Sequence, residues 1–193
     1  MTSVKLKSIL FLWLLLPLQV LSNQPENSFD DLLNEAGLTL VLPANFSQQA
    51  IQQNELFPYE HALRHENNTL EIRYAIRPLS RMEINYQDPH SSAPEPNHIF
   101  SMMFTALIGR LSNGGSSPHR EYQLEEAQQK FNADWAAISV FDIEEEYSSD
   151  YKQAFLVALH KNNLSDAYLV ILFNDYEQSK PLLDQAIQSL QFK

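Results

Sequence analysis

The run from Ala167 to Phe173 (Ala-Tyr-Leu-Val-Ile-Leu-Phe) most constrains how this chain can fold. Every residue in it is apolar or aromatic, so a strand formed by this run would have no face suited to water. Such a strand must be covered on both sides by other elements. We therefore expect it to lie at the centre of a layered sheet.

A β-hairpin is predicted over residues 59–77. Its arms are Tyr59–His65 and Leu70–Arg77, and the residues between them, Glu66-Asn67-Asn68-Thr69, are typical of a turn. Along the second arm, Leu70, Ile72, Tyr74 and Ile76 alternate with Glu71, Arg73, Ala75 and Arg77. This period of two predicts a strand with one buried face.

The other periodic segments complete an α+β pattern. Strands are expected at 38–42, 136–142, 151–161 and 167–173, and helices at 97–111, 121–131 and 179–190. The pair Asn162-Asn163 predicts a tight turn between the last two strands. Because these hairpin signals favour antiparallel pairing, we expect an antiparallel sheet with helices on one or both faces.

The N-terminus has the features of a secretory signal peptide. Lys5 and Lys7 precede an apolar run from Ile9 to Leu21, and a cleavage site follows between Ser22 and Asn23. The run is shorter than the roughly 20 apolar residues that span a bilayer. The protein is therefore expected to be periplasmic or secreted, with no stable membrane anchor after the signal is removed.

The expected organisation is a signal peptide over 1–22, a polar leader over 23–36 and a single domain over 37–193. The chain has no cysteine, which excludes thiol catalysis, disulfides and thiolate metal sites. Without Lys5 and Lys7, the 13 basic residues become 11 against 24 acidic ones, a formal charge of −13. This charge disfavours nucleic acid and anionic membranes and favours a basic partner or cations. The favoured interpretation, however, is that the charge serves only solubility.

Three segments carry a family resemblance. They are Phe131–Trp135 leading into a strand, the hairpin around Asn162-Asn163, and the closing Ile187–Phe192. Here the chain resembles the PsbP-like family, which includes the DcrB-like bacterial envelope proteins, most closely over its C-terminal third. The resemblance implies an α/β/α sandwich with a mostly antiparallel central sheet and a non-catalytic binding or accessory role, and it carries over no functional residue. DcrB-like proteins are often lipoproteins, whereas this chain lacks the required cysteine.

No metal ion or other cofactor is predicted. His61 and His65 are four residues apart, and on a strand this spacing separates side chains by roughly 13 Å, too far to share one ion. Both are expected to be half-exposed. The acidic cluster formed by Asp142, Glu144–Glu146 and Asp150 lacks the central glycine of an EF-hand loop. A solvated loop, or a docking patch for a basic partner, is the better interpretation.

Catalytic motifs are also missing from the sequence. It contains no Gly-x-Ser-x-Gly and no glycine-rich phosphate loop, so the chain is not predicted to be an enzyme. A hydrolase formed by serine, histidine and acidic residues that converge only in space is the least favoured alternative.

The segment 97–111 is the candidate functional element, because its apolar residues extend most of the way around the helix. The candidate partner or ligand surface comprises Met102, Met103, Phe104, Leu107 and Trp135. Methionine-rich surfaces adapt to varied partners, so the leading hypothesis is an adaptor for another envelope protein. One alternative is a carrier of a small apolar ligand in a pocket lined by Phe104, Trp135 and Tyr168. For the helix itself, simple packing on the sheet is favoured over a movable element that opens a groove or presents Met102, Met103 and Phe104 to a partner.

Overall fold

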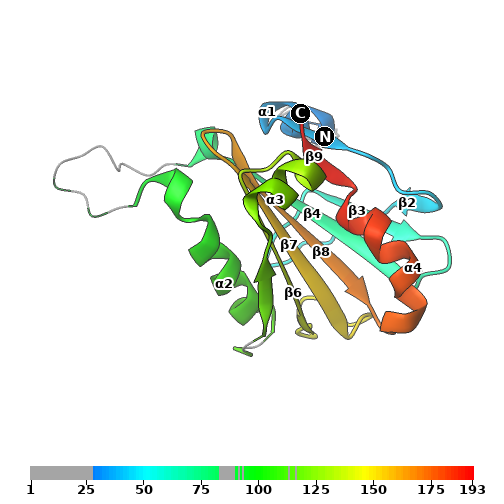
Figure 1. Cartoon of the computed structure of the whole chain (residues 1–193). Helices are drawn as coiled ribbons and strands as arrows, with labels where there is room; N and C mark the ends of the chain where they lie inside the picture. Colours follow the sequence, from blue (N-terminus) through cyan, green and yellow to red (C-terminus); the bar gives the residue numbers. More distant parts are fainter. Residues whose placement is uncertain (1–27, 83–89, 91, 93, 113, 116) are drawn as a thin grey trace, which may run out of the picture.

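The structure is a computed structural model that describes residues 28–82, 90, 92, 94–112, 114–115 and 117–193 (Figure 1). The predicted signal peptide and its cleavage site between Ser22 and Asn23 lie outside the described residues. No helix in the described ranges combines the length and the apolar character needed to cross a membrane.

A seven-stranded sheet with antiparallel pairing throughout forms the centre of the fold. In spatial order its strands are β2 (Phe46–Gln48), β3 (His61–His65), β4 (Leu70–Pro78), β8 (Ser165–Phe173), β7 (Gln153–Lys161), β6 (Trp135–Asp142) and β5 (His119–Glu121). A separate two-stranded sheet pairs β1 (Leu38–Leu40) with β9 (Leu190–Phe192).

Strand β8 lies in the middle of the large sheet, between β4 and β7, and every one of its residues is buried. This confirms the expectation for the apolar run 167–173. Both predicted hairpins are also present, β3 with β4 and β7 with β8.

Helices cover both faces of the sheet. The helices α1 (Phe29–Glu35), α3 (Leu124–Phe131) and α4 (Tyr176–Ile187) contribute, together with β1 and β9, to the larger apolar core on one face. Helix α2 (Phe100–Leu111) contributes to a second core on the other face (Figure 1). Two short 3-10 turns occur at Leu79–Arg81 and Pro96–His98. The fold is the predicted α+β class, an α/β/α sandwich with a mostly antiparallel sheet.

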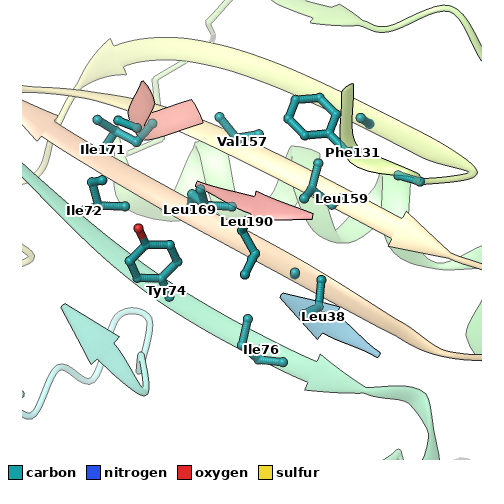
Figure 2. Close-up of a cluster of buried hydrophobic side chains, with 14 of the residues drawn as sticks. Leu38, Ile72, Tyr74, Ile76, Phe131, Val157, Leu159, Leu169, Ile171 and Leu190 are labelled. Carbon is teal, nitrogen blue, oxygen red and sulfur yellow. The ribbon is translucent and has the colours of Figure 1, made fainter. Parts of the chain in front are cut away.

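The larger core joins residues from distant parts of the chain (Figure 2). Leu38 of β1 and Leu190 of β9 pack in the same core as Tyr74 and Leu169 of the large sheet, and all four are fully buried. Each buried leucine contributes about 1.5–3 kcal/mol to folding. The hydroxyl of Tyr74 is 2.8 Å from the Ser189 hydroxyl, which satisfies a polar atom that burial would otherwise penalise.

The segment assigned to a polar leader contains helix α1, which belongs to the folded unit. Ser28 caps it: its hydroxyl accepts from the Asp31 amide and its amide donates to the Asp31 carboxylate, a capping box. Leu32 and Leu33 are buried in the larger core. Residues 29–36 of the predicted leader therefore pack against the domain predicted over 37–193.

Strand β4 departs from the prediction because both of its faces are buried. Glu71 is only 2% exposed, and its carboxylate accepts hydrogen bonds from Arg64 Nε and Arg73 Nε, each at 2.8 Å. Tyr59 and Tyr147 lie on the Arg73 guanidinium, 5.0 and 4.8 Å from it. Ion pairing and aromatic cover thus let charged side chains alternate with apolar ones in a strand that has no solvent face.

His61 and His65 lie on a strand, as predicted, but both are buried and not half-exposed. The ring of Phe29 stacks on His61 at 4.4 Å, and Phe46 meets His65 edge-on at 5.1 Å. Helix α1 and strand β2 therefore cover two histidines that the local sequence pattern predicts to be half-exposed. The described residues hold no group of three or more side chains suited to binding a metal ion.

Candidate partner-binding surface on helix α2

Both ends of helix α2 are fixed to the rest of the fold. Before its first turn, the Asn97 side chain donates to Asn163 Oδ1 at 2.9 Å and accepts from the Asn163 amide at 2.6 Å, at the β7–β8 turn. At its end, the Leu111 carbonyl accepts from the Glu144 amide at 2.7 Å. Arg110 donates to the Glu55 carbonyl at 2.8 Å. These contacts hold α2 as a fixed element of the fold.

The inner face of α2 is part of the second core. Phe104, Leu107, Ile108 and Leu111 are buried there at helical spacing. The structure therefore corrects two residues of the predicted surface: Phe104 and Leu107 pack inward and are not available to a partner. Their loss would leave a cavity beside β6 and β7, on which the helix packs.

The outer face of α2 carries the two methionines of the predicted surface. Met102 is 59% exposed and Met103 is 38% exposed. Ser101 and Thr105 share this face, and the Thr105 hydroxyl donates to the Ser101 carbonyl at 3.0 Å. The outer face thus presents two long, flexible apolar side chains on a rigid support.

An aromatic group connects α2 to the sheet. The half-buried Trp135 meets Phe104 edge-on at 5.8 Å and Phe100 at 4.8 Å. Phe100 also stacks on His160 at 4.1 Å, and His119 meets Phe104 edge-on at 5.6 Å. Trp135, the fifth residue of the predicted surface, thus packs on Phe104 and Phe100 and supports the helix. Sequence reasoning missed His160, although the register that pairs it with Trp135 follows from the β6–β7 pairing.

A buried histidine and carboxylate lie beneath Phe100. His160 Nδ1 is 2.6 Å from Asp166 Oδ1, and both residues are about 1% exposed. His160 Nε2 is 3.3 Å from Asn162 Oδ1, whereas Asp166 Oδ2 has no hydrogen-bond partner in the described residues. In serine hydrolases, a carboxylate placed in this way orients the histidine that acts as the general base. Here the Phe100 ring covers the imidazole, and among the described residues no serine hydroxyl is bonded to it, so the arrangement does not form a triad.

The three residues predicted to line a carrier pocket pack against the second core. Phe104, Trp135 and Tyr168 are not among the residues that line the hollows of about 250–470 Å³ at residues 112–153, 41–191, 58–82, 79–163 and 51–59. Tyr168 is buried against Phe57, whose ring meets it edge-on at 5.6 Å. Burial raises the pKa of the Tyr168 phenol above its ordinary value, so this side chain is neutral. These three residues fill space in the second core.

Comparisons with known proteins address the fold. No family model matches the chain, and no curated protein matches it. Among solved structures, the chain is similar to the solution structure of cyanobacterial PsbP (CyanoP) from Synechocystis sp. PCC 6803. The match has a TM-score of 0.45 and 8% sequence identity, and it covers 82% of this chain and 88% of that chain. The PsbP-like and DcrB-like resemblances both stay predictions.

Proposed function

We propose that this protein is a non-catalytic binding protein, an accessory or adaptor for another protein of the bacterial envelope. Its contact surface is the outer face of α2, with Met102 and Met103 at the centre. The observation that carries the proposal is the 59% exposure of Met102 on a helix whose two ends and inner face are fixed. A rigid helix pays little ordering entropy on binding, while methionine side chains adapt to the partner's shape.

The proposed location is the periplasm or the extracellular space. It is supported by the signal-peptide pattern over residues 1–22 and by the lack of cysteine, which leaves a processed chain without a thiol for lipidation. The formal charge of −13 after processing favours a partner with a basic surface.

Site-specific crosslinking in living cells tests the proposal. A photoreactive residue at position 102 is compared with the same residue at position 51, because Ile51 is similarly exposed (53%) and does not lie on α2. We expect a discrete crosslinked product from position 102 that position 51 does not give. Identical products from both positions, or none from 102, would contradict a binding role for this face.

A variant in which a flexible linker replaces the whole of α2 would not test the outer face alone. Phe104, Leu107 and Leu111 are core residues, so their removal would destabilise the fold along with the surface. Substitutions confined to Met102 and Met103 avoid this problem.

A further inference from the structure

The helix layer on the larger core leaves one end of the sheet uncovered. Helices α3 and α4 lie over different parts of this face (Figure 1). This uncovered part of the sheet contains the C-terminal half of β6 and the N-terminal end of β7. Val140 is 38% exposed there, and Ile138 and Phe155 are only partly buried. Val140 and Phe155 are direct partners in the antiparallel register, so their side chains adjoin on the same face.

The start of helix α4 extends this apolar area. Tyr176 is 43% exposed, and its ring lies 6.4 Å from that of Phe155. Phe155 in turn stacks on the buried Phe173 at 5.4 Å, which anchors the area to the core. We call Ile138, Val140, Phe155 and Tyr176 the open sheet patch. Exposed aromatic and β-branched residues that adjoin in this way are typical of interaction sites.

The margin of the open sheet patch is acidic. Asp142 follows Val140 by two residues on the same face of β6, and Asp175 and Glu177 flank Tyr176. All three acids are exposed, and within the described part of the chain no salt bridge joins them to a basic side chain. Lys180, with its Nζ 5.9 Å from the Tyr176 ring, is a cation at this margin. The balance of charge favours a basic ligand.

A hollow of about 400 Å³ opens at the same end of β6. Val140, Asp142 and Gln153 are among the residues that line it, and Gln153 Nε2 donates to Asp142 Oδ1 at 3.2 Å. A long side chain from a ligand lying on the patch could enter this hollow. Its carboxylate-containing wall again suits a lysine or an arginine.

We propose that the open sheet patch is a docking site for an amphipathic helix of a partner protein, with an apolar face flanked by lysine or arginine. Such a helix would complete the layer that α3 and α4 begin. The alternative of an added β-strand is disfavoured because β5 already pairs with β6 over Ala137–Ser139. Since α2 packs on the opposite face of the sheet, this proposal stands or falls independently of the one for Met102 and Met103.

The probe is a synthetic leucine–lysine amphipathic peptide of about five helical turns. Its controls are the leucine–glutamate counterpart and a peptide of the same leucine–lysine composition in a non-amphipathic order. Affinity is measured by calorimetry on the processed chain, and the site is mapped by amide shifts in NMR spectra. We expect shifts confined to residues near 138–142, 153–157 and 174–178, and at least about tenfold weaker binding of both control peptides.

Variants make the test specific. Val140→Lys should weaken binding of the probe by about tenfold or more, whereas Met102→Ser on the opposite face should leave it unchanged. If Val140→Lys proves unfolded, the exposed Tyr176→Ser takes its place. Shifts centred elsewhere, equal binding of the control peptides, or no effect of these variants would overturn the proposal. A dimer of the wild type that Val140→Lys abolishes would also overturn it, by identifying a second copy as the occupant.

Discussion

His160 and Asp166 face each other across the β7–β8 hairpin with 2.6 Å between Nδ1 and Oδ1, and both side chains are almost fully buried. The Phe100 ring stacks on this imidazole, so the first turn of α2 packs against the His160–Asp166 pair. The geometry that resembles part of a catalytic triad thus positions the helix proposed to bind a partner.

Removing the carboxylate should destabilise the fold. Asp166→Ala leaves His160 Nδ1 buried without its partner, and we expect a loss of about 1–3 kcal/mol in the free energy of unfolding. Urea titration followed by circular dichroism measures the loss. Glu145→Gln in the exposed acidic loop is the matched control and should change stability by less than about 0.5 kcal/mol. Equal stability of the two variants would contradict a structural role for the pair.

Glu71 should be sensitive to substitution because it is buried between two arginines. Glu71→Gln removes the anion between Arg64 and Arg73, and an uncompensated buried charge costs about 3–5 kcal/mol. The lower end is expected because Arg64 is partly exposed. The combined change of Glu71→Leu and Arg73→Met should recover much of the loss, since no unpaired charge stays buried. If the double variant unfolds as readily as Glu71→Gln, the ion pair does not explain the cost.

Burial of His61 should make stability depend on pH. Burial lowers the pKa of His61 below its ordinary value of 6.5, and the nearby Asp30 partly offsets this. The unfolded chain therefore binds the proton more readily, so stability should fall as the pH drops through 6.5 toward the lower folded-state pKa. Phenylalanine at this position keeps the stack on Phe29, so His61→Phe should flatten this part of the profile. Unfolding free energies of both proteins across this range test the prediction, and parallel profiles would refute it.

Two glycines should respond in opposite ways to alanine. Gly37 has φ +65° at the end of α1, and a Cβ atom there would lie 2.5 Å from Leu164 Cδ2. Gly37→Ala should therefore cost at least about 1–2 kcal/mol. Gly109 lies within α2 with nothing near its missing Cβ, so Gly109→Ala should stabilise the protein by up to about 1 kcal/mol. Thermal unfolding of the two variants checks this pair, and a shift of the same sign in both would be inconsistent with the structure.

The elements that the sequence predicts well are those with a local signal. The apolar run 167–173 indicates its central place, and the alternation along 70–77 indicates a strand. The burial of Glu71 and Arg73 has no such signal, because the segments that contribute Tyr59 and Tyr147 to their cover lack a regular period. The pairing of Leu38 with Phe192 joins residues that are far apart in the sequence, so it depends on the whole fold.

The candidate surface was only partly predictable for a similar reason. A helix that is apolar on most sides does not reveal which side faces the core. Contacts of Phe104 with Trp135 and His119 fix the rotation of α2, and this rotation leaves Met102 and Met103 outside. Phe104 and Leu107 therefore belong to packing, although they are close in sequence to the exposed methionines.

The outer face of α2 is proposed to bind a protein partner without contributing to the fold. The Met102→Ser, Met103→Ser double variant is therefore compared with Ile51→Ser. For each protein, the unfolding free energy is measured together with the yield of the partner identified by crosslinking at position 102. We predict that the double variant keeps its stability to within about 0.5 kcal/mol and loses the partner, while Ile51→Ser retains both. Undiminished capture by the stable double variant would contradict the claim.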